Sequence, residues 1–120
     1  MIAKGHGAIV NISTMAARLA VPGMSVYGAT KAALESLTRT WATEFGGSGI
    51  RVNAIAPGTT RSDKVMSVMG AAAEQMGAAT PLGRTAATSE IARVAVFLAS
   101  DQSSYLTGAT IPVDGDRTAI

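Results

Sequence analysis

The order of a short strand, a long helix and a second short strand in the first half of the sequence constrains the fold most strongly. An apolar run over residues 8–12 predicts a buried strand, and a second such run covers residues 51–56. Between them, apolar side chains recur at three- and four-residue steps over residues 25–45, which is typical of a helix. A strand, a helix and a strand in this order favour a right-handed crossover between parallel strands. The sequence therefore predicts an α/β fold built on a parallel sheet.

The long helical pattern carries its own start and stop signals. Ser25 has the hydroxyl of an N-cap residue, and Gly46-Gly47 ends the pattern. The apolar stripe of this helix consists of Leu34, Leu37, Trp41 and Phe45. Stripes of this kind usually pack against the core or against another subunit, so we do not expect Trp41 to contact a cofactor.

The second half of the sequence adds weaker elements. Residues 62–79 form a soft helical segment in which glycines alternate with methionines. A further helix, capped by Thr88 or Ser89, is predicted to end near Ser100. Residues 109–113 predict a third strand, which Pro112 either places at a sheet edge or ends early. We therefore expect residues 1–120 to form one domain of about three strands with flanking helices.

Composition and charge argue against several classes of function. The formal net charge is +2 and the basic residues are scattered, so nucleic-acid and membrane surfaces are not indicated as partners. The sequence has no cysteine, and His6, its only histidine, lies in a glycine-flanked loop, so we expect no metal site. No apolar run reaches the ~20 residues of a membrane helix, and residues 1–4 do not resemble a signal peptide. These features favour a cytoplasmic protein.

A tyrosine and a lysine near the start of the long helix are the best candidates for chemistry. Tyr27 and Lys31 are four residues apart and therefore project from the same helical face. A lysine ammonium beside a phenol favours the phenolate, so Tyr27 is a candidate acid–base. Two hydroxyls, Ser13 and Thr14, follow the first strand, and Pro57-Gly58 follows the second. Ligands of doubly wound sheets bind beyond these carboxyl ends of the strands.

At this point the sequence resembles the short-chain dehydrogenase/reductase family. Residues 7–13 (GAIVNIS) resemble the fifth strand of the family, Tyr27-x-x-x-Lys31 its catalytic signature, and residues 53–58 (NAIAPG) its sixth strand. The tail of the family is matched in order and spacing by residues 81–84 (PLGR), 97–101 (FLASD) and 106–115 (LTGATIPVDG). The resemblance covers essentially the whole chain but only the C-terminal half of a typical member. It implies a partial Rossmann-like, doubly wound parallel sheet.

The resemblance also implies a reaction and the residues that perform it. Members of the family interconvert an alcohol and a carbonyl with NAD or NADP, which supplies or accepts the hydride. Tyr27 would transfer the proton, and Lys31 would assist it and hold the ribose hydroxyls of the nicotinamide nucleotide. The family's serine, which orients the substrate oxygen, lies thirteen residues before the tyrosine, where this sequence has Thr14. We expect Thr14 to take that role, with Ser13 as the alternative.

The cofactor contacts implied by the resemblance surround the ends of both strands. They are Ser13, Tyr27, Lys31, Pro57, Gly58, Thr60 and Ser62. Asn53 is expected to be a structural hydrogen-bonding residue. The segment from Met66 to Met76 is expected to form a mobile, mostly apolar substrate lid. The implied partner is a small alcohol or carbonyl substrate.

The half of the family that this chain does not match leads to an alternative. The family's glycine-rich phosphate loop does not occur in this sequence, so we expect the chain to bind the dinucleotide weakly. The alternative is a catalytically inactive half-domain that associates with itself or with a partner. The strand over residues 8–12 would expose an apolar edge, and such edges pair with other chains. A homo-oligomer is therefore expected.

Overall fold

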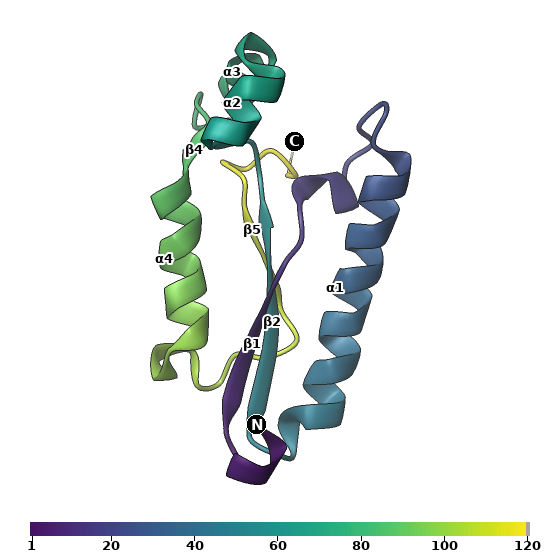
Figure 1. The fold of residues 1–120 in the computed structure, drawn as a ribbon, viewed down its shortest axis with the longest axis vertical. Helices are drawn as coiled ribbons and strands as arrows, with labels where there is room; N and C mark the ends of the chain where they lie inside the picture. Colours follow the sequence, from purple (N-terminus) through teal and green to yellow (C-terminus); the bar gives the residue numbers. More distant parts are fainter. Residues whose placement is uncertain (120) are drawn as a thin grey trace.

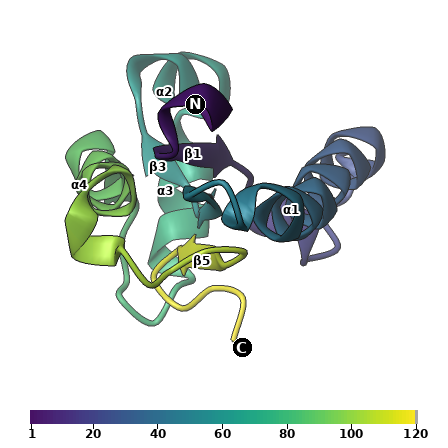
Figure 2. The same cartoon turned by 90° about the horizontal axis from the view of Figure 1, so that it is seen from below.

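The computed structural model describes residues 1–119 and places a parallel sheet between two helices (Figure 1). The strands lie in the order β1 (Gly7–Ile12), β2 (Ile50–Pro57) and β5 (Thr110–Val113), and both pairings are parallel. Seen from below, α1 (Ser25–Gly46) and α4 (Thr88–Ala99) lie on opposite faces of this sheet (Figure 2). The predicted α/β fold with a doubly wound parallel sheet is confirmed.

Shorter elements connect these layers, and several of them gather beyond the carboxyl ends of the strands. Two-residue strands, β3 (Thr60–Arg61) and β4 (Ala86–Ala87), pair in parallel as a second small sheet. The helices α2 (Asp63–Met69) and α3 (Ala71–Ala78) lie between them in the chain and at the top of the molecule (Figure 1). The 3-10 helices are Ile2–Lys4, Met15–Ala17 (η2) and Asp101–Ser103.

The core lies where α1 packs on the central strand. Ile50 and Val52 of β2 are buried with Ala42 of α1, and Trp41 and Phe45 pack against this cluster. The aromatic part of the predicted stripe therefore does pack on the core. Leu37, by contrast, is exposed. The buried residues of α1 are instead Gly28, Glu35, Thr38 and Ala42, so small and polar side chains take much of the inner face of the helix.

The predicted helix caps are wrong. Ser25 is the first residue of α1, and the N-cap position is Met24, whose side chain makes no capping hydrogen bond. Helix α4 begins at Thr88, so neither Thr88 nor Ser89 is its cap. The chain enters α4 from β4, which leaves Ala87 extended at the N-cap position. Its free N–H donates to the Glu90 carboxylate at 2.8 Å, so the cap comes from inside the helix.

The soft segment over residues 62–79 forms two short helices. The chain turns at Gly70, which has φ +49° and ψ −121° and separates α2 from α3. A positive φ is strained for residues with a Cβ, which explains why the break falls on a glycine. Ser62 caps α2, because its hydroxyl oxygen accepts the Val65 N–H at 3.2 Å.

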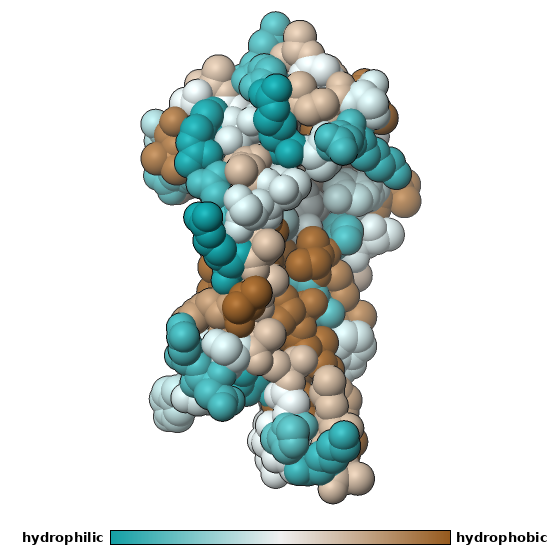
Figure 3. Space-filling model, turned by 60° about the vertical axis from the view of Figure 1, so that its left-hand side comes forward, coloured by the Kyte–Doolittle hydropathy of each residue, from teal (hydrophilic) through white to brown (hydrophobic). Residues whose placement is uncertain are grey.

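The two outer strands of the main sheet, β1 and β5, each pair with one described strand, whereas the central strand β2 pairs with two. Strand β5, which contains Pro112, is an edge strand of the sheet and pairs only with β2 among the described strands, as expected from the proline. Within residues 1–119, β1 pairs with β2 and leaves its other edge without a partner strand. Ile12 at the end of β1 and Phe97 of α4 are exposed. Figure 3, which turns the α4 side forward, shows apolar side chains gathered at mid-height of this face.

Candidate active site

A cavity of about 280 Å³ opens at the carboxyl ends of β1 and β2. It is walled by the segment after β1, the first turn of α1, the segment after β2, and helices α2 and α3. The expected site residues that line it are Ser13, Thr14, Tyr27, Pro57, Gly58 and Thr60. Parallel strands end at the same edge of a sheet, so residues more than forty positions apart in the sequence meet here.

Tyr27 and Lys31 lie in the first two turns of α1, on the face next to this cavity. The Tyr27 side chain is 47% exposed and lines the cavity. The Lys31 ammonium nitrogen lies 5.9 Å from the centre of the Tyr27 ring and donates to the Ile12 carbonyl at 2.8 Å. Lys31 does not itself line the cavity. Its charge is instead held between the end of β1 and the tyrosine ring, within the range of a cation–π contact.

The two hydroxyls after β1 are in different environments. Ser13 is buried, and its hydroxyl donates to the Glu35 carboxyl at 2.7 Å. Thr14 is only partly buried, and its oxygen accepts the Ala16 N–H at 3.3 Å. Accepting this bond leaves the Thr14 proton free to donate into the cavity. The geometry therefore favours Thr14 over Ser13 as the group that meets a substrate oxygen.

The segment after β2 supplies the opposite wall. The Gly58 N–H donates to the Val113 carbonyl at 3.0 Å, and a Cβ at Gly58 would lie only 2.7 Å from the Asp114 Cα. Glycine is therefore required where β2 and β5 end. The Thr60 hydroxyl donates to the Gly58 carbonyl at 3.1 Å and lines the cavity. Ser62 lies outside the lining, as the cap of α2.

The remaining wall is apolar and comes from the segment that the sequence suggested as a lid. Val65 and Met69 of α2 and Met76 of α3 line the cavity opposite the polar groups. The unbranched, flexible methionine side chains form an adaptable surface. A ligand would therefore meet hydroxyls and an aromatic ring on one side and aliphatic side chains on the other.

Glu35 is a site residue that the sequence reasoning missed. It lies one turn after Lys31 and two turns after Tyr27 on the same helical face, and that spacing is the signal that could have found it. Its carboxyl group is buried, accepts the Ser13 hydroxyl and pairs with the Arg18 guanidinium at 3.3 Å. Its partners lie 22 and 17 residues away, so neither is visible as a local pattern.

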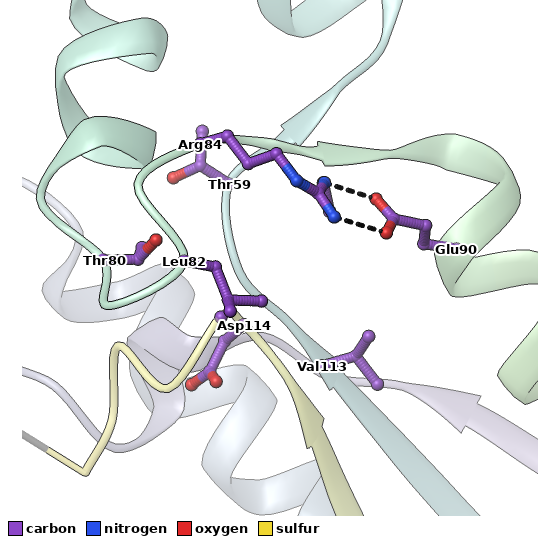
Figure 4. A pocket seen from close by; sticks show the side chains of 9 residues that line it. Thr59, Thr80, Leu82, Arg84, Glu90, Val113 and Asp114 are labelled. Atoms are coloured by element: carbon purple, nitrogen blue, oxygen red, sulfur yellow. Dashed lines mark hydrogen bonds and ion pairs between the residues drawn. The ribbon is translucent and has the colours of Figure 1, made fainter.

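A second, smaller hollow of about 70 Å³ lies near the start of α4 (Figure 4). Arg84 and Glu90 form a two-point ion pair at 2.7 and 2.8 Å at its rim. The hydrogen bond from Arg84, followed by that from the Ala87 N–H, lowers the pKa of Glu90 to about 2. The volume of the hollow is about a quarter of the 280 Å³ of the cavity at the ends of β1 and β2. The ion pair between Arg84 and Glu90 ties the turn before β4 to α4, and the hollow is too small for a substrate.

Neither metal-binding clusters nor membrane-spanning helices are found in the part of the chain that the structure describes. No three His, Cys, Asp or Glu side chains among residues 1–119 gather in a way that could hold a metal ion. No helix in the same range is long and apolar enough to cross a membrane.

The chain is similar in sequence to known proteins over almost its whole length. A family model described as enoyl-(acyl carrier protein) reductase matches residues 1–116. The 3-oxoacyl-(acyl-carrier-protein) reductase of Thermotoga maritima is 43% identical over 115 residues, which are 96% of this chain and 47% of that protein.

Solved structures match the whole chain as well. A short-chain dehydrogenase/reductase family protein superposes with a TM-score of 0.94 at 55% identity, covering 100% of this chain and 49% of that one. A gluconate 5-dehydrogenase from Burkholderia cenocepacia, in complex with NADP and tartrate, has a TM-score of 0.91 at 36% identity. That match covers 99% of this chain and 48% of the dehydrogenase. The chain thus spans about half the length of the relatives it matches.

Proposed function

Because the chain belongs to the short-chain dehydrogenase/reductase family, we propose that it supplies the nicotinamide and substrate half of an NAD(P)-dependent site that interconverts an alcohol and a carbonyl. One observation carries this proposal. Tyr27 and Thr14 line the same cavity, and the Lys31 ammonium nitrogen lies 5.9 Å from the centre of the Tyr27 ring. A proton donor, a second hydroxyl and a fixed positive charge are groups that assist the reduction of a carbonyl by a hydride donor.

Each of these groups has one role. During reduction the Tyr27 phenol gives its proton to the substrate oxygen, and during oxidation the phenolate takes that proton back. The Thr14 hydroxyl donates a hydrogen bond to the same oxygen and so fixes its position. The Lys31 ammonium stabilises the phenolate that remains after proton transfer. The nicotinamide cofactor, when bound, supplies or accepts the hydride.

The residues at the ends of β1 and β2 fit the nicotinamide end of such a cofactor. Gly58 and Thr60 bring backbone and hydroxyl groups to the cavity wall, and Pro57 closes the end of β2. In this proposal the Lys31 ammonium would donate to the ribose hydroxyls of the nicotinamide nucleotide. Ser13 and Ser62 would act more indirectly, because their hydroxyls bind Glu35 and the first turn of α2. NAD and NADP both remain candidates.

The test compares reduced nicotinamide mononucleotide with NADH and NADPH as hydride donors. The substrate is a 3-oxoacyl thioester, because one relative is a 3-oxoacyl-(acyl-carrier-protein) reductase. The proposed contacts reach only the nicotinamide end, so we expect kcat/KM for the mononucleotide within about tenfold of the dinucleotides, about 1.4 kcal/mol. The decrease in nicotinamide absorbance measures the rate. Absence of turnover with all three donors would contradict the proposed function of this chain.

A second proposal concerns self-association, which the open edge of β1 favours. An unpaired apolar edge can pair with a second copy of the chain. We expect Ile12→Lys, at the exposed end of β1, to shift the chain towards monomer in sedimentation experiments at micromolar concentration. Val26→Lys is the matched control, because Val26 is an exposed β-branched residue on α1. A wild-type chain that is already monomeric, or a loss of association in the control alone, would count against pairing through this edge.

A further inference from the structure

Polar contacts, rather than apolar packing alone, hold α1 against the end of β1. The Lys31 ammonium donates to the Ile12 carbonyl at 2.8 Å. One turn later Glu35 accepts the Ser13 hydroxyl at 2.7 Å. One turn further on, the Asn11 amide donates to the Thr38 hydroxyl at 2.9 Å. The helical partners are spaced by four and three residues and so share one face of α1.

Glu35 is the member of this series that joins three segments. It is 7% exposed, and its carboxyl oxygens bind Ser13 at the end of β1 and Arg18 after η2. Ser13 is held from the other side as well, because its N–H donates to the Ile55 carbonyl at 2.7 Å. A buried carboxyl group is costly unless its partners compensate it. None of the roles assigned above to the site residues uses Glu35.

We propose that Glu35 is a positioning residue that, through Ser13, places Lys31 and Thr14 relative to Tyr27. This inference rests on the proposed function, because it assigns these three residues their roles. Ser13 is flanked by Ile12, whose carbonyl binds Lys31, and by Thr14, which lines the cavity. Fixing the Ser13 side chain against α1 therefore fixes both neighbours. Glu35 sets the register of the helix along the strand.

Loss of the acceptor at residue 35 has a specific consequence. In Glu35→Leu the Ser13 hydroxyl loses its partner, and the end of β1 is no longer held to α1 at this point. The Ile12 carbonyl then moves away from Lys31 more often, so the ammonium is free of this exposed hydrogen bond for more of the time and reacts faster. In Glu35→Gln the amide oxygen still accepts the Ser13 hydroxyl. The two variants have similar side-chain volumes and differ in this bond.

Competitive acetylation of the folded chain with acetic anhydride measures the effect. The sequence has three lysines, Lys4, Lys31 and Lys64, so mass spectrometry can report Lys31 relative to two internal references. We expect Glu35→Leu to raise the relative modification of Lys31 by about 3- to 10-fold, as for the loss of one hydrogen bond. Glu35→Gln is expected to restore it to within about twofold of wild type.

Two further variants separate positioning from general stability. Thr38→Val removes the neighbouring contact to Asn11 without touching Ser13, and we expect it to leave the labelling of Lys31 unchanged. Ser13→Ala removes the same bond from the strand side and should raise the labelling, even if Glu35→Leu does not fold. Unchanged labelling in Ser13→Ala, or an equal rise in Thr38→Val, would overturn the inference.

The labelling experiment is independent of turnover. It needs neither cofactor nor substrate, so the two proposals can fail separately. A chain that labels as expected but reduces no carbonyl contradicts the proposed function and leaves the positioning of Lys31 by Glu35, through Ser13, established. A chain that reduces carbonyls but labels identically in all variants contradicts the role of Glu35 alone.

Discussion

Replacing Tyr27 with phenylalanine is expected to lower turnover of a carbonyl substrate by about 10²- to 10⁴-fold, the usual contribution of a positioned acid–base group. The substitution removes the phenol proton and keeps the ring that lies over Lys31. Water would then have to protonate the substrate oxygen. Because the Tyr27 side chain is 47% exposed, the fold should not depend on its hydroxyl.

Tyr105→Phe is the matched control for this prediction. The two tyrosines are the only ones in the sequence, and Tyr105 is fully exposed and does not line the cavity. Steady-state rates are measured under identical conditions for both variants, together with their thermal unfolding. We expect similar melting temperatures and a rate loss in Tyr27→Phe alone. Turnover that survives in Tyr27→Phe would contradict the acid–base role.

Asn53→Leu is expected to lower the free energy of unfolding by about 2–5 kcal/mol, through two unsatisfied backbone groups and lost packing. Asn53 lies in the middle of β2 and is 1% exposed. Its amide donates to the Leu106 carbonyl at 2.7 Å, and its oxygen accepts the Ala109 N–H at 3.0 Å. Leucine can replace neither bond, and both backbone partners precede β5.

Urea unfolding followed by the fluorescence of Trp41, the single tryptophan, measures this loss. Asn11→Leu is the matched control, because Asn11 is the other asparagine and its amide makes one side-chain hydrogen bond, to Thr38. We expect it to cost about 0.5–1.5 kcal/mol. A larger loss in Asn11→Leu than in Asn53→Leu would show that the Asn53 bonds do not hold the start of β5.

The elements that the sequence predicted best are those set by local periodicity. The run over residues 8–12 and the helical repeat over residues 25–45 appear as β1 and α1 with shifts of one residue at their ends. A continuous apolar run and a repeat of 3.6 residues are both local properties, because each depends only on the residues of its own segment. The spacing of Tyr27 and Lys31 could be read for the same reason.

The helix ends and the partners of the polar side chains could not be predicted in this way. Ser25 and Thr88 have the hydroxyls of cap residues, yet both lie inside their helices. Whether such a hydroxyl caps depends on the direction from which the chain enters the helix, and β4 decides that direction for α4.

By itself, the sequence determined the strand–helix–strand order, the parallel sheet and the pair formed by Tyr27 and Lys31. Only the tertiary structure decided which of the two hydroxyls after β1 keeps its proton free, although both residues line the cavity. Glu35, 22 residues away in the sequence, takes the hydroxyl of Ser13 and leaves that of Thr14 free. The physical reason is that periodicity specifies faces, whereas a hydrogen bond between distant residues exists only after helix and strand have docked in one register.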